Sequence, residues 1–103
     1  MSCFTEAVCW DTNLAEVVTF LEDILSEAHV SQVIWDVCRI YYTSSEGESR
    51  FITVQDIGND QVKVFAGARG DAVEYVAATT KKFGGVHTLD EHEPDKINIY
   101  RRV

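Results

Sequence analysis

A single apolar stripe, from Leu14 to Ala28, most strongly limits what this chain can fold into. Apolar residues recur there at steps of three and four, the spacing of one buried face of an α-helix. Just before it, Asn13 and Glu16 have the spacing of a capping box, which predicts that the helix begins here. The helix is expected to end near His29, because the chain then becomes rich in β-branched and aromatic residues. The stripe consists of Leu14, Val17, Val18, Leu21, Ile24, Leu25 and Ala28.

Most of the remaining chain has the composition of β-strands. Residues 30–43 are predicted to form one long strand with apolar residues on both sides, typical of a central strand covered on each face. The polar segment 44–49 and the turn residues 58–60 separate the strands that follow, which predicts an antiparallel meander. The other strands are expected at residues 3–10, 50–57, 61–66, 86–89 and 96–103.

A second helix is predicted from Gly70-Asp71 to Phe83. Asp71 and Glu74 repeat the capping-box spacing, and Gly84-Gly85 is a strong stop signal. The element order is therefore (β)-α-β-β-β-α-(β)-β. It predicts an α+β two-layer sandwich, with two helices on one face of an antiparallel sheet of four to six strands. A length of 103 residues is that of a single domain, residues 1–103.

Charge is distributed unevenly along the chain. Residues 1–38 contain seven acids and no lysine or arginine, whereas the rest of the chain contains ten acids and nine bases. Nearly all of the net charge of −8 therefore belongs to the first third. Such a surface repels nucleic acid and anionic lipid and attracts basic proteins. The seven acids are Glu6, Asp11, Glu16, Glu22, Asp23, Glu27 and Asp36.

Several of these acids lie on the first predicted helix, away from its buried stripe. Asp23 and Glu27 are like charges four residues apart, which costs a helix about 0.2–0.5 kcal/mol. The helix contains no lysine or arginine that would offset this cost. Phe20 lies beside the acids, and an aromatic residue ringed by carboxylates is typical of a protein docking site. The predicted partner-binding residues are Glu16, Phe20, Glu22, Asp23 and Glu27.

An ordinary solvated helix face is the alternative interpretation. In that case the acids pair with Arg39, Arg50, Arg101 or Arg102 after folding, and Phe20 lies under a loop. The sequence leaves open whether Arg101 and Arg102 neutralise the acidic helix face.

The remaining candidates for chemistry are weak. The histidines and acids of residues 87–93 have ligand types that suit a divalent cation, but their spacing matches no metal-binding pattern, which favours a solvated loop. Cys3, Cys9 and Cys38 form no C-x-x-C motif, which indicates free thiols in a reducing cytoplasm. No catalytic residue, metal or cofactor is therefore expected. The histidines and acids in question are His87, Asp90, Glu91, His92 and Glu93.

The leading hypothesis is a non-enzymatic, cytoplasmic, acidic inhibitor that docks on a basic surface of a protein that handles nucleic acid. An anti-CRISPR-like phage inhibitor of a CRISPR effector and an immunity protein for a nuclease toxin both fit this description. Neither a membrane nor direct binding to nucleic acid is expected, because the strand aromatics lack the basic groove that a stacking platform needs.

Two alternatives belong to other classes. The first is a small α+β ligand-binding or metal-dependent enzyme domain that uses His87, Asp90 and His92. The second is a self-associating homodimeric module, which pairs through an edge strand at 96–103 or through a sheet face bearing Tyr42 and Phe51.

Overall fold

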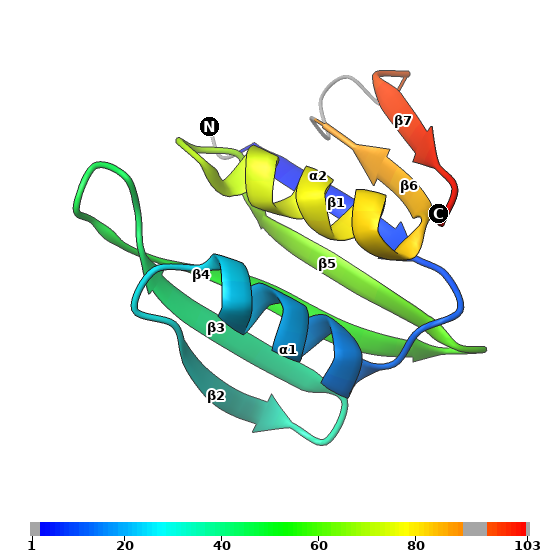
Figure 1. The fold of residues 1–103 in the computed structure, drawn as a ribbon, viewed down its shortest axis with the longest axis horizontal. Coiled ribbons are helices and arrows are strands. Elements are labelled where there is room, and N and C mark those ends of the chain that lie inside the picture. Colours follow the sequence, from blue (N-terminus) through cyan, green and yellow to red (C-terminus); the bar gives the residue numbers. More distant parts are fainter. Residues whose placement is uncertain (1–2, 90–94, 103) are drawn as a thin grey trace.

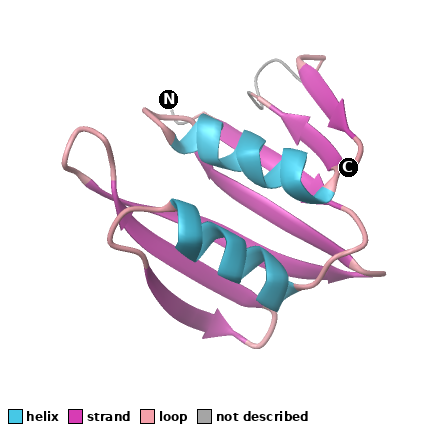
Figure 2. Ribbon diagram, viewed as in Figure 1, coloured by secondary structure: helices cyan, strands magenta, loops and turns pink. Residues whose placement is uncertain are grey.

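Two helices pack side by side on one face of an antiparallel sheet in the computed structural model, which describes residues 3–89 and 95–102 (Figure 1, Figure 2). The predicted α+β class is confirmed. The elements are β1 (Phe4–Cys9), α1 (Leu14–Ile24), β2 (His29–Ile34), β3 (Val37–Thr43), β4 (Ser49–Gly58), β5 (Gln61–Gly67), α2 (Ala72–Phe83), β6 (Gly85–Thr88) and β7 (Ile97–Tyr100). In the described part of the chain seven strands form one sheet, in the order β2-β3-β4-β5-β1-β6-β7. The sheet therefore has one strand more than the upper limit of the expected four to six.

The additional strand comes from residues 30–43, which form a hairpin. The chain reverses at Trp35 and Asp36, so that Ile34 pairs with Val37 and the two strands lie antiparallel. The prediction of one central strand covered on both faces was wrong, because β2 is an edge strand. The turn was not predicted because residues typical of strands continue on both sides of it, and Asp36 is the one typical turn residue at the point where the chain reverses.

Helix α1 begins where the sequence predicts. The Asn13 side-chain oxygen accepts a hydrogen bond from the Glu16 backbone N–H at 2.9 Å, which caps the helix. The Glu16 carboxylate in turn accepts a hydrogen bond from the Thr12 hydroxyl at 3.0 Å. The cap therefore also fixes the position of an acid that was predicted to bind a partner.

The same helix ends at Ile24, earlier than the predicted end near His29. Leu25 has an extended backbone, and Glu27 has a positive φ of 55°. This turn places the Ser26 carbonyl where it accepts the Thr43 N–H of β3 at 3.0 Å. Leu25 is still buried in the core, so its apolar character reflects the turn rather than a longer helix.

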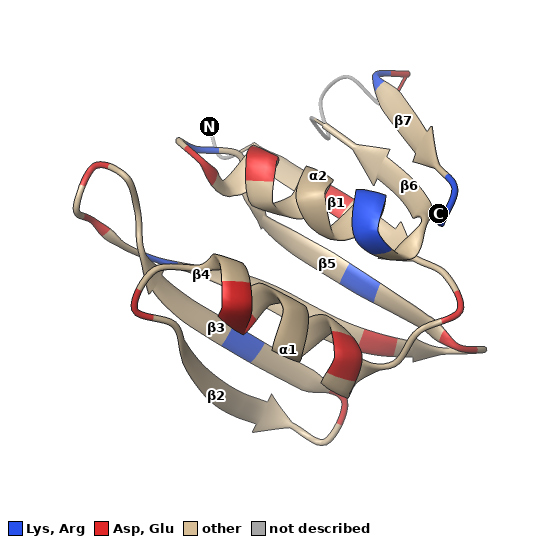
Figure 3. Cartoon of the chain, viewed as in Figure 1, with Lys and Arg blue, Asp and Glu red and all other residues tan. Residues whose placement is uncertain are grey.

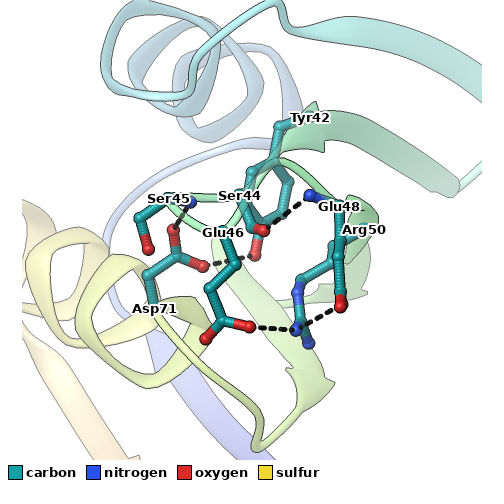
Figure 4. A network of polar contacts seen from close by, with 7 residues as sticks. All are labelled: Tyr42, Ser44, Ser45, Glu46, Glu48, Arg50 and Asp71. Atoms are coloured by element: carbon teal, nitrogen blue, oxygen red, sulfur yellow. Dashed lines mark hydrogen bonds and ion pairs between the residues drawn. The ribbon is translucent and has the colours of Figure 1, made fainter.

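Helix α2 ends at the predicted glycine pair, but its predicted capping box is absent. Asp71 makes no side-chain capping hydrogen bond. Its carboxylate instead accepts hydrogen bonds from the Tyr42 hydroxyl at 3.3 Å and from the Ser45 N–H at 3.1 Å (Figure 4). In the same loop Arg50 pairs with Glu48 at 2.8 Å (Figure 4). Asp71 therefore ties the start of α2 to the β3–β4 loop.

The core lies between the helices and the sheet. Alternate residues of the strands point toward the helices, as a period of two requires. The opposite face of the sheet is covered by neither α1 nor α2, and we call it the helix-free face. The buried core consists of Ala7, Cys9, Val17, Leu21, Leu25, Ile40, Tyr42, Ile52, Val54, Val62, Val64, Ala66, Ala72, Val76 and Phe83.

Candidate interaction surfaces

A groove of about 500 Å³ runs between α1 and α2, and we call it the helical groove. Its apolar part is formed by Phe20 and Phe83, whose rings meet edge to face with their centroids 5.7 Å apart. Edge-to-face contact is a favourable arrangement for two aromatic rings, so the two helices hold this part of the groove in place. The lining residues are Ala15, Glu16, Thr19, Phe20, Asp23, Lys82 and Phe83.

The structure brings together three of the five residues that were predicted to bind a partner. Glu16, Phe20 and Asp23 line the helical groove. Glu22 is exposed on α1 but does not line the groove. Glu27 lies beyond the end of the helix, where its carboxylate accepts a hydrogen bond from the Thr43 hydroxyl at 2.6 Å. The prediction that Asp23 and Glu27 repel each other on one helix was therefore wrong, because Glu27 is not part of α1.

Phe20 is half-buried rather than freely exposed. It packs against Phe83 of the neighbouring helix, which the alternative interpretation of a loop cover did not anticipate. The contribution of α2 to the groove was missed as well. Phe83 is buried at the end of α2, and its ring reaches the groove from there.

The acids of α1 are only slightly neutralised by the arginines of the chain. In the described residues one such contact exists, between Arg102 Nη2 and Glu16 Oε2 at 3.9 Å, and both side chains are about half exposed. An exposed pair of this kind contributes about 0–1 kcal/mol. Arg50 instead pairs with Glu46 and Glu48, and Arg39 stacks on Phe51 with 4.9 Å to the ring centroid.

Figure 3 shows how charge is arranged around the helical groove. Acidic residues lie on α1 and at the start of α2, and basic residues lie at the end of α2 and in the C-terminal segment beside it (Figure 3). Lys82 lines the groove opposite the acids of α1. The groove thus has an acidic wall on α1 and a basic corner where α2 ends.

The helix-free face combines polar residues with several large apolar ones. Four of its side chains are large, hydrophobic and exposed: Phe4, Phe51, Ile97 and Ile99. Tyr41 lies directly opposite Phe51 in the neighbouring strand, with the ring centroids 5.5 Å apart. Several large apolar side chains exposed on one sheet face favour a protein contact there.

The charged residues that the strands place on the helix-free face are few. Lys63 pairs with Glu6 at 2.8 Å, and Arg39 covers the ring of Phe51. The sheet face that was expected to bear both Tyr42 and Phe51 does not exist. Tyr42 is buried on the helix side of β3, and Phe51 lies on the opposite side of the sheet.

The hairpin between β2 and β3 carries a second exposed apolar site. The Trp35 side chain at its turn is 94% exposed. Val33 and Ile34 beside it are also exposed. Sequence reasoning placed Trp35 in the middle of a strand and therefore missed this position.

Only part of the predicted cluster of metal-ligand types lies within the described residues. His87 is fully buried on β6, whereas Asp90, Glu91, His92 and Glu93 lie outside the described residues. Within residues 3–89 and 95–102, no three histidines, cysteines or acids are grouped so as to hold a metal ion. The three cysteines are free, and burial raises the pKa of the Cys9 thiol to about 12. A thiol with such a pKa is protonated at neutral pH and is a poor nucleophile.

The described helices are too short to cross a lipid bilayer. In comparisons with protein-family models, curated protein sequences and solved structures, no significant match to this chain was found.

Proposed function

We propose that this protein is a non-enzymatic binding protein that docks its helical groove on a basic surface of another protein. One observation carries the proposal: Glu16 and Asp23 stand on the same groove wall beside the half-buried ring of Phe20. A desolvated aromatic contact supplies affinity in protein interfaces. Carboxylates around it favour cationic partners and accelerate association.

Proteins that handle nucleic acid are the partner class that fits this surface best. They present lysine and arginine to the phosphate backbone, and a chain with a net charge of −8 imitates that polyanion. The proposed consequence is inhibition, because the docked protein blocks the nucleic-acid path. An anti-CRISPR-like phage inhibitor and a cytoplasmic immunity protein for a nuclease toxin are the two settings that we propose.

Two neighbouring acids on α1 allow a matched test. Asp23 lines the helical groove and Glu22 does not, although both are exposed. Asp23→Lys and Glu22→Lys make the same charge change at adjacent positions. In affinity purification from the native host, the wild type and Glu22→Lys should retain a basic protein that Asp23→Lys loses. Both variants should melt within a few degrees of the wild type.

Equal retention of the basic protein by the two variants would contradict docking through the groove. Equal loss would show that net charge, and not the groove, determines binding. In both cases the proposal is overturned.

A second candidate function is self-association through the helix-free face. The exposed side chains of Phe51 and Ile99 favour it, because an apolar sheet face on a two-layer fold is normally covered. A second copy is the proposed cover, since two such faces pack as the sheets of a β-sandwich do. The two candidate functions use opposite sides of the molecule and are compatible.

A further inference from the structure

The side chain of Arg102 contacts two residues that line the helical groove, Phe83 and Glu16. Its guanidinium carbon is 5.6 Å from the centroid of the Phe83 ring. Its Nη2 atom is 3.9 Å from the Glu16 carboxylate. An aromatic face and a carboxylate are the two groups that most often receive a guanidinium in proteins. Two residues of the groove lining therefore already contact one arginine, which the C-terminal segment of the chain supplies.

Backbone packing brings this arginine to the groove. Gly84 follows α2 with a φ of +84°, and a Cβ atom at this position would lie 2.8 Å from the Arg102 nitrogen. Only glycine allows the segment to pass so closely. Strand pairing of Tyr100 with Gly85 carries the chain to this point. The position of Arg102 is thus determined by β7 and Gly84.

The side-chain contacts of Arg102 are weak enough to be exchanged. Its ion pair with Glu16 is long and about half exposed, and such pairs contribute little to stability. The cation–π contact lies on a ring that α2 holds in the core, so the ring remains in place when the arginine leaves. A second guanidinium would find the same ring and the same carboxylate.

We infer that Glu16 and Phe83 form a binding site for an arginine of the partner protein, which Arg102 occupies in the free state. This inference rests on the proposed docking of the helical groove. It adds that the partner contributes arginine rather than lysine and must displace Arg102. Lysine carries the same charge, but its compact ammonium group is strongly hydrated and has no planar surface to lay on the Phe83 ring.

The test uses two labelled peptides of equal length and charge, hexa-arginine and hexa-lysine, with fluorescence anisotropy at low ionic strength. The wild type should bind hexa-arginine several-fold more tightly than hexa-lysine. Arg102→Gln should strengthen hexa-arginine binding several-fold further, because the competing guanidinium is removed. Arg101→Gln is the matched control, since it makes the same charge change at an adjacent exposed residue.

Two further variants test the site itself. Glu16→Gln removes the charge of the carboxylate and should weaken hexa-arginine binding. Phe83→Leu removes the aromatic face but keeps an apolar side chain in the core, so it should abolish the preference for arginine over lysine. If Phe83→Leu fails to fold by circular dichroism, Arg102→Gln and Glu16→Gln still decide the question.

Equal effects of Arg102→Gln and Arg101→Gln would overturn the inference, and so would equal affinity of the wild type for the two peptides. Neither result touches the affinity purification with Asp23→Lys and Glu22→Lys. Failure of the arginine site and failure of groove docking are therefore distinguishable.

Discussion

His87 is a fully buried histidine, and its Nδ1 atom has no hydrogen-bond partner among the residues that the structure describes. The Thr5 hydroxyl donates to the Thr88 carbonyl at 3.4 Å and lies 2.6 Å from His87 Nε2. Which group donates in the 2.6 Å contact depends on the tautomer of the ring. Burial disfavours the charged ring and lowers the pKa of His87. Protonation would place an unpaired charge in the interior.

This shift predicts how stability depends on pH. In the unfolded chain His87 has its ordinary pKa of 6.5, so the unfolded state takes up a proton before the folded state does. Titration of His87 should therefore not lower the free energy of unfolding above pH 6.5, and it should lower this free energy as the pH falls below 6.5. A loss of about 1 kcal/mol would lower the melting temperature by about 4–8 °C for a domain of this size.

Thermal unfolding between pH 8 and 5 measures the effect. His87→Gln should reduce the loss of stability below pH 6.5, although the variant is less stable overall. His29→Gln, at an exposed histidine, should unfold with the pH dependence of the wild type. Parallel curves for the wild type and His87→Gln would show that His87 does not cause the acid sensitivity.

The sequence predicted which residues are buried in the core far better than which residues form an interaction site. The apolar period correctly placed Val17 and Leu21 in the core. It could not show that Phe20 meets Phe83, because that contact joins residues far apart in the chain. Nor could it show the role of Asp71, whose spacing fits a helix cap but whose carboxylate binds the β3–β4 loop.

At the scale of elements, the proposed self-association through the helix-free face can be tested at a single strand residue. Ile99 on β7 is 64% exposed on this face. Ile99→Lys places a charge there and should shift any dimer to monomer in light scattering over a dilution series. Ala15→Lys, on the exposed side of α1, is the control and should leave the oligomeric state unchanged. A wild type that remains monomeric at high concentration would eliminate self-association.

The sequence predicted the elements well where local chemistry decides them. Asn13 begins α1 and Gly84 ends α2, as their capping preferences require. The end of α1 and the β2–β3 hairpin were missed because tertiary pairing decides them. Ser26 leaves the helix to bond β3, and Trp35 turns inside a run of strand-forming residues. At both places tertiary pairing overrides the intrinsic helix or strand propensity of the residues.

At the scale of the whole molecule, the acids of the first third do not form one continuous surface. Glu6 lies on the helix-free face and pairs with Lys63, and Asp36 lies at the hairpin turn. The helical groove keeps Glu16 and Asp23. The fold therefore divides the acidic residues of the first third between the two faces of the molecule.

The central claim is that the helical groove receives the cationic side chains of a partner. The most direct measurement is a titration of ¹⁵N-labelled protein with hexa-arginine, followed by amide chemical shifts. The account predicts that the largest shifts fall on residues 15–23, on residues 82–84 and on Arg102. Shifts that are equally large around the acidic residues Glu46, Asp56 and Asp60, with no concentration at the groove, would contradict it.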